Sequence, residues 1–121
     1  EVQVKGAESE RDARAAARAV AASSLLKAAV YGNDPNWGRI ACAAGYSGAN
    51  LVESKLDITI AGFPVLQQGK VLSFDARAAS NALKQPAVTI LVNLNLGENS
   101  ATAWGCDLTE EYVVINSKYT T

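Results

Sequence analysis

Residues 88–96 carry the pattern that most constrains the fold. Five aliphatic residues alternate with four others over nine positions: Val88, Ile90, Val92, Leu94 and Leu96 on one side, Thr89, Leu91, Asn93 and Asn95 on the other. A strict two-residue period is typical of a β-strand with one face against a core. Its length favours a central strand, so the chain is expected to be built around a sheet.

Alanine-rich segments with helical spacing surround this strand. One follows Ser9 and Asp12, which resemble a capping box with Asp in place of Glu, and its apolar face contains Ala13, Ala16, Ala17, Val20 and Ala21. Ser23 or Ser24 interrupts it and caps a second helix that ends near Gly32. A further helix is predicted from Ser73 or Asp75 through Leu83, with Pro86 marking its end.

Shorter patterns predict the remaining elements. Val2 and Val4 indicate the end of a strand before a turn at 5–8, and residues 56–60 and 63–66 indicate a hairpin or meander around Gly62. The chain turns again at 68–69 into a strand at 71–72. A polar loop at 95–100 precedes a strand at 101–106, and Asp107 with Glu110 predicts a short C-terminal helix. The expected architecture is layered α/β (α+β), a mixed β-sheet packed with Ala-rich helices in a single domain, 1–121.

Composition is consistent with one globular domain. The chain has 121 residues, of which 49% are hydrophobic and 19% charged, and a formal net charge of −1. So small a charge argues against nucleic acid as a partner. No apolar run approaches the roughly 20 residues that span a bilayer, and the first residues lack a signal-peptide layout, so neither membrane nor secretion is expected. Cys42 and Cys106 are predicted to be reduced packing residues, without a metal site.

Residues 32–40, Gly-Asn-Asp-Pro-Asn-Trp-Gly-Arg-Ile, have an unusual composition for a surface turn. Asp34 is pushed toward an extended conformation by Pro35, which suits a first helical turn. Asn33 or Asp34 can then cap the exposed amides. The run is predicted to be a loop that enters a helix.

The second half of this run offers packing and hydrogen bonding. Trp37 is expected to anchor the helix, Gly38 to allow close backbone approach, and Arg39 to donate to a carboxylate or to carbonyls. We favour a structural corner over direct contact with a ligand, since Trp and Gly usually serve packing.

Two segments resemble a known family. Residues 23–45, SSLLKAAVYGNDPNWGRIACAAG, and residues 101–121, ATAWGCDLTEEYVVINSKYTT, are similar to the C-terminal part of the β chain of the ornithine acetyltransferase family, also called the bifunctional glutamate N-acetyltransferases of arginine biosynthesis. The most specific pieces are DPNWGRI, WGCDLT and the terminal YVVIN. The resemblance covers nearly the whole chain.

The resemblance implies a fold, an activity and partners. It implies the C-terminal lobe of the family's fold and transfer of acetyl from N2-acetylornithine to glutamate, through an acetyl-enzyme on an N-terminal Thr exposed by autocatalytic cleavage. It also implies a heterotetramer of two α and two β chains, in the cytoplasm or in an organelle such as a chloroplast or mitochondrion. No cofactor is implied, and acetyl-CoA is admitted as an additional donor.

The chain departs from the family pattern at its start. Its first residue is Glu1, and no Ala-Thr-Met cleavage motif occurs in it. The family's oxyanion donors, a lysine and an acidic residue would also lie upstream. With no histidine in the sequence, a Ser-His or Cys-His pair cannot form. The chain alone is therefore expected to be inactive, with no catalytic residue of its own.

Two substrate-binding residues are implied by the resemblance, Asn116 and Thr121. An Asn amide both donates and accepts, and a C-terminal Thr offers a hydroxyl and a carboxylate for an ammonium group. On residue type alone, Asn116 could equally be a helix-terminal cap and Thr121 a frayed tail. Lys118 and Tyr119 receive no role, and Arg39 is a structural or supporting residue.

Two other functions fit the same residues. The first is a noncatalytic amino-acid-binding or assembly module that retains the lobe without its nucleophile. The second is a related self-cleaving amidohydrolase or aminopeptidase, for which water rather than glutamate would accept the acyl group.

Overall fold

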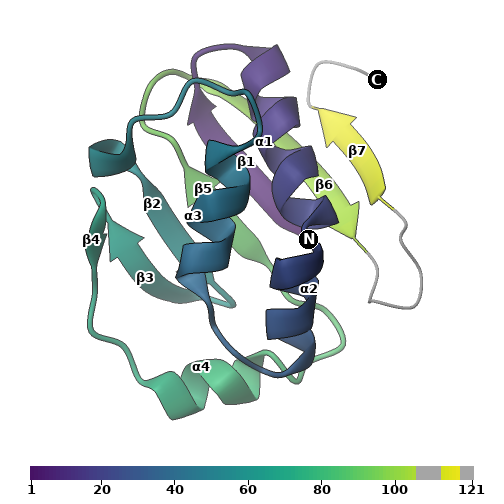
Figure 1. Cartoon of the computed structure of the whole chain (residues 1–121), viewed down its shortest axis with the longest axis vertical. Helices are drawn as coiled ribbons and strands as arrows, with labels where there is room; N and C mark the ends of the chain where they lie inside the picture. Colours follow the sequence, from purple (N-terminus) through teal and green to yellow (C-terminus); the bar gives the residue numbers. More distant parts are fainter. Residues whose placement is uncertain (106–112, 118–121) are drawn as a thin grey trace.

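The computed structural model describes residues 1–105 and 113–117. The described strands form one mixed sheet in the order β4-β3-β2-β5-β1-β6-β7 (Figure 1). β1 and β5 are parallel, and all other neighbours are antiparallel. The strands are β1 Val2–Ala7, β2 Asp57–Ile60, β3 Phe63–Gln67, β4 Lys70–Val71, β5 Ile90–Asn93, β6 Asn99–Gly105 and β7 Val113–Ser117.

Helices cover one face of this sheet. In Figure 1, α1 and α3 lie across β1, β5 and β6, α2 lies where β1 begins and β6 ends, and α4 lies near the end of the sheet where β5 begins. The bounds are α1 Glu10–Ala22, α2 Ser24–Tyr31, α3 Trp37–Gly45 and α4 Ala76–Ala82, with a 3-10 turn, η1, at Glu53–Lys55. The predicted mixed sheet packed with Ala-rich helices is confirmed.

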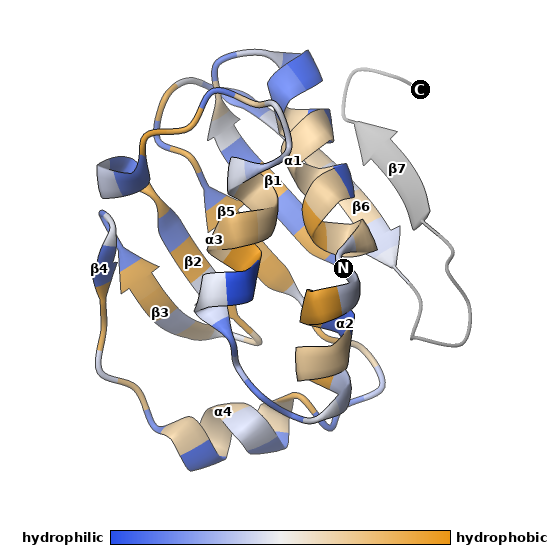
Figure 2. Cartoon of the chain, in the orientation of Figure 1, coloured by the Kyte–Doolittle hydropathy of each residue, from blue (hydrophilic) through white to orange (hydrophobic). Residues whose placement is uncertain are grey.

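The core lies between the helices and the sheet. Alternate strand residues are buried on the helix side. Figure 2 shows hydrophobic segments along both the strands and the helices that enclose this core. The predicted face of α1 is confirmed, because its alanines and Val20 are buried. Small side chains let this helix approach the strands closely. The strand residues on the helix side include Val2, Val4, Ile58, Ile60, Ile90, Val92, Ala101 and Ala103.

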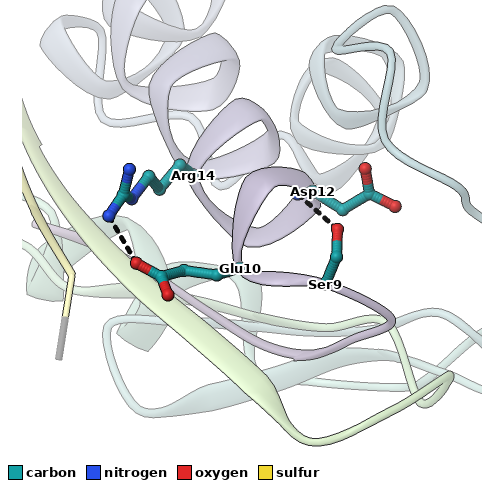
Figure 3. A network of polar contacts seen from close by, with 4 residues as sticks. All are labelled: Ser9, Glu10, Asp12 and Arg14. Carbon is teal, nitrogen blue, oxygen red and sulfur yellow. Dashed lines mark hydrogen bonds and ion pairs between the residues drawn. The ribbon is translucent and has the colours of Figure 1, made fainter. Parts of the chain in front are cut away.

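Three predicted helix caps are confirmed. The Ser9 hydroxyl accepts from the Asp12 amide at 3.0 Å at the start of α1, as Figure 3 shows. One turn along the same helix, the Arg14 guanidinium pairs with the Glu10 carboxylate (Figure 3). Ser23 accepts from the Leu26 amide at 3.1 Å, and Asp75 from the Ala78 amide at 3.0 Å. Each cap satisfies an amide that the helix leaves unpaired.

The ends of β1 and β5 differ from the predictions. β1 continues to Ala7 instead of turning at 5–8, because Gly6, with φ of 71°, forms an irregularity in its pairing with β6. β5 is shorter than predicted and covers only 90–93. Asn95 then adopts a left-handed φ of 54°, and the amides of Leu96 and Gly97 donate to the Gly6 carbonyl at 2.7 and 2.8 Å. Consequently β6 begins at Asn99, inside the predicted loop.

The carboxyl-terminal prediction is partly outside the described residues. The short helix expected to start at Asp107 falls in the range 106–112. Residues 113–117 form β7 at the edge of the sheet, beside β6. The interpretation of Asn116 as a helix-terminal cap is therefore wrong, because this residue belongs to a strand.

Candidate functional site

The Asn-Asp-Pro-Asn run forms the corner between α2 and α3. Asn33 has a left-handed φ of 59°, and the Asp34 amide donates back to the Ala29 carbonyl at 2.8 Å. These residues therefore complete the end of α2. The first position free to cap α3 is Asn36, whose Oδ1 accepts from the Arg39 amide at 3.0 Å. The prediction that Asn33 or Asp34 caps this helix, with Pro35 in its first turn, is wrong.

Arg39 holds the two helices together. Its Nη1 donates to the Leu25 carbonyl at 2.7 Å, in the first turn of α2. Trp37 is half-buried against the core, as expected of an anchor. An added Cβ on Gly38 would meet only Asn36 Oδ1 within 4 Å, at 3.4 Å, so the expected close backbone approach is absent. The corner serves packing, and Arg39 donates to a carbonyl within the fold.

Cys42 does not pack as predicted. It is an exposed, free thiol on α3. The buried residues of that helix are Ile40 and Ala44, one turn apart, and Cys42 lies between them on the opposite side. Cys106 lies outside the described residues.

A cleft of about 760 Å³ opens beside α2. One wall is α2, the other is the segment 83–90 that leads from α4 into β5, and the ends of β1 and β6 border it (Figure 1). Leu26, Leu83 and Ile90 are buried beneath it. This volume and largely apolar wall are typical of a small-molecule site.

The charged side chains around the cleft are mostly basic. Lys27 comes from α2 and Lys84 from the opposite wall, and the residues described by the structure offer neither an ion pair. Glu1 is the only acid among the described lining residues, and its carboxylate accepts from Gln3 Nε2 at 2.6 Å. The cleft is therefore suited to an anion.

The α-amine of Glu1 lies at the same border. It donates to the Val88 carbonyl at 2.8 Å, and the Ile90 amide donates to the Glu1 carbonyl at 2.8 Å, so β1 and β5 remain paired here. Burial lowers the pKa of this amine below its ordinary value of 8.0, and the nearby Glu1 carboxylate partly opposes the shift.

The predicted substrate-binding residues are only partly placed. Asn116 pairs with Thr102 in the ladder between β6 and β7. Trp104, two residues further along β6, borders the cleft, so the backbone of Asn116 is about 7 Å along the strand from that border. Thr121, Lys118 and Tyr119 lie outside the described residues. The sequence did not indicate Lys27 and Lys84, since only the fold brings α2 opposite 83–90.

The opposite end of the sheet also has a cluster of polar residues, whose members form hydrogen bonds with one another. Asn95 Nδ2 donates to the Lys55 carbonyl at 2.6 Å and to Asp57 Oδ2 at 2.9 Å. Asp57 Oδ1 accepts from the Gln68 amide at 2.8 Å. Internal pairing of this kind joins loops and leaves little capacity for a ligand.

The described part of the chain contains neither a metal-binding cluster nor a membrane-spanning helix. Within residues 1–105 and 113–117, no three His, Cys, Asp or Glu side chains gather as a metal site would require. In the same residues, every helix is too short or too polar to cross a bilayer.

Comparisons with known proteins identify relatives. The ArgJ family matches residues 1–121. The chain is 50% identical over 126 residues to the chloroplastic arginine biosynthesis bifunctional protein ArgJ of Oryza sativa subsp. indica, covering 100% of this chain and 27% of the relative. It is 51% identical over 120 residues to the ArgJ bifunctional protein of Thermus thermophilus, covering 99% and 31% respectively.

A solved structure agrees with the fold. The crystal structure of the ArgJ bifunctional protein from Bacillus halodurans matches with a TM-score of 0.86 and 41% identity, over 92% of this chain and 53% of that chain. The chain thus spans somewhat less than a third of the two curated relatives named above. With sequence and fold in agreement over essentially all of its residues, the chain belongs to the ArgJ family.

Proposed function

We propose that this chain is part of an acetyltransferase that moves acetyl from N2-acetylornithine to glutamate in arginine biosynthesis. The observation that carries the proposal is the ArgJ family match over residues 1–121. The nucleophile is an N-terminal Thr that a companion segment supplies. The working assembly contains two α chains and two β chains in an aqueous compartment, the cytoplasm or an organelle such as the chloroplast.

The chemistry of this chain supports a divided active site. Its sequence has no histidine to activate a Ser or Cys. An N-terminal Thr needs no such partner, because its own α-amine can take the proton from its hydroxyl. The chain alone is inactive in this proposal, and it supplies part of the substrate pocket.

The reaction proceeds in two balanced steps. The Thr hydroxyl attacks the acetyl carbonyl of N2-acetylornithine, its proton passes to the α-amine, and the ornithine amine leaves after accepting a proton. The glutamate amine then attacks the acetyl ester, and the Thr hydroxyl is restored as N-acetylglutamate leaves. No bound cofactor is needed, and acetyl-CoA could enter the first step with its thiol as leaving group.

Asn116 and Thr121 orient the substrate in this proposal. The Asn116 amide both donates and accepts hydrogen bonds, which suits an amino acid with a carboxylate and an ammonium group. Thr121 adds a hydroxyl, which can donate and accept hydrogen bonds. Neither role requires these residues to change protonation.

Reconstitution tests the proposal. The chain is combined with the remaining family segments, including one that begins with Thr, and N-acetylglutamate is measured with N2-acetylornithine as donor. We expect product only in the complete assembly, and none when the companion's first Thr is replaced by Ala. No transfer by an intact assembly would contradict the proposal. Equal acetate release with and without glutamate would favour the amidohydrolase, and ornithine binding without turnover would favour the noncatalytic module.

A further inference from the structure

We propose that the cleft between α2 and residues 83–90 binds a small organic anion, whose carboxylate or phosphate is held by Lys27 and Lys84 and whose aliphatic body lies on the apolar wall. The proposal concerns this cleft in the 121-residue chain and stands independently of the acetyltransferase activity. Either headgroup presents the same oxygen acceptors to an ammonium, and the experiment below separates them.

The first argument concerns charge. Lys27 is half-buried on α2 and lines the cleft together with Leu26 and Val30. Lysine commonly covers apolar surface in this way while its ammonium stays available. Among the described residues no carboxylate pairs with it. A lysine in the cleft wall without an ion-pair partner can pair with an anion in the cleft.

The second argument concerns geometry. Lys84 lines the same cleft from the segment 83–90, so we expect an anion there to accept from both ammonium groups. Glu1 is the one acid among the described lining residues, and its carboxylate accepts from Gln3 Nε2 at 2.6 Å. This hydrogen bond makes the carboxylate a weaker competitor with an anionic ligand for the two lysines. The side-chain amide of Asn33 adds a donor at the rim, with no hydrogen bond to another described residue. The cleft lining thus offers three side-chain donors to an oxygen-bearing headgroup.

The third argument concerns the apolar wall. Leu26, Leu83 and Ile90 are already buried, but two other lining residues, Tyr31 and Trp104, are 77% and 37% exposed. A bare inorganic ion would leave these exposed rings facing water, whereas an aliphatic chain could lie against them and gain roughly 0.8 kcal/mol per buried methylene. The cleft therefore favours an anion with an alkyl body over phosphate or acetate alone.

Calorimetric titration of the folded 121-residue chain tests the proposal. The chain is acetylated at Glu1 so that the α-amine cannot contribute charge, and its cooperative thermal unfolding is checked first. The probes are hexanoate, hexyl phosphate, inorganic phosphate and the uncharged hexanol. We expect saturable binding of hexanoate or hexyl phosphate, with weaker binding of the other two, and the preferred probe identifies the headgroup.

Matched variants connect the binding to the lysines. We expect Lys27→Met and Lys84→Met each to weaken binding by about tenfold or more, as for a lost hydrogen bond between charged groups. Lys27→Arg should retain most of the affinity. Lys70→Met, at an exposed lysine on β4 outside the cleft, should leave it unchanged. Unfolding midpoints are measured for every variant.

Several results would overturn the proposal. One is that none of the probes binds to the folded chain. Another is that hexanol binds as tightly as hexanoate, or inorganic phosphate as tightly as hexyl phosphate, because then charge or the alkyl body would not matter. A third is undiminished affinity in the folded Lys27→Met and Lys84→Met variants.

Discussion

At the scale of single residues, the corner between α2 and α3 depends on two polar side chains. Arg39 donates to the Leu25 carbonyl at 2.7 Å, and Asn36 accepts from the Arg39 amide at 3.0 Å. Both bonds satisfy backbone groups near a helix start, where the chain reverses between packed elements. Arg and Asn often contact ligands, but here Arg39 and Asn36 stabilise the turn between the two helices.

Replacing Arg39 tests the bond between the helices. Arg39→Ala should lower the free energy of unfolding by about 1.5 kcal/mol, because a charge-assisted hydrogen bond to a backbone carbonyl is lost. Urea unfolding measures the change. Arg77→Ala removes an exposed arginine from α4 and should have an effect within about 0.5 kcal/mol. Equal effects of the two substitutions would refute a specific role for Arg39.

Replacing Asn36 tests the helix cap. Asn36→Ala should cost about 1 kcal/mol of stability, and Asn36→Ser should retain most of it, because a Ser oxygen can also accept from the first-turn amides. The control is Asn81→Ala at an exposed position in α4. Chemical unfolding of the variants decides between them, and a fully stable Asn36→Ala would show that water satisfies the Arg39 amide equally well.

At the scale of elements, hydrophobic period identified the strands and helices, but local backbone geometry set their ends. The alternation at 88–96 correctly located β5 and its buried side, since side-chain period directly reports burial. Its early end depends on the left-handed Asn95, and the late end of β1 depends on the positive φ of Gly6. Such conformations arise from contacts between distant strands, which a local pattern does not contain.

Gly6 provides a test of this geometry. A Cβ at this position would lie 2.2 Å from Asn93 Oδ1 and 2.7 Å from the Asn95 amide nitrogen, at a φ of 71°. Gly6→Ala should therefore destabilise the fold by at least about 2 kcal/mol, combining left-handed strain with the clash. Gly48→Ala is the matched control, because φ there is 87° and nothing lies within 4 Å. It should cost only about 1 kcal/mol.

Urea unfolding of both glycine variants gives the comparison. The difference between them isolates the close approach of β1 to the end of β5, since both carry backbone strain. If Gly6→Ala lowers the free energy of unfolding by no more than Gly48→Ala does, the loop at 93–95 can move to accommodate the added Cβ. In that case the loop does not determine where β1 ends.

At the scale of the whole molecule, the family was readable from the sequence, and the cleft was not. A continuous motif such as DPNWGRI can be recognised directly in the sequence, and the family match confirms the resemblance that these motifs indicated. The cleft is lined by α2, by residues 83–90 and by residues near positions 1 and 105. Because these segments are far apart in the sequence, no short stretch of sequence could predict the cleft. The assignment of Asn116 and Thr121 came only from resemblance and stays a prediction.

The same cleft border makes the stability of the 121-residue chain depend on pH. Burial lowers the pKa of the Glu1 amine below 8.0 in the folded state. Between the lowered pKa and 8.0, the unfolded chain binds more protons at this group than the folded chain does. Stability must therefore rise with pH across that window. The penalty for burying the ammonium is complete below the folded pKa and absent above 8.0.

Acetylation of the Glu1 amine isolates this effect, because the amide keeps an N–H for the Val88 carbonyl and carries no charge. We expect the free-amine chain to be less stable than the acetylated chain at about pH 6, with the difference shrinking toward zero by about pH 9. Urea unfolding midpoints of the two chains across this range measure it. A difference that stays constant or grows with pH would show that burial does not disfavour the ammonium, whose charge would then add to those of Lys27 and Lys84.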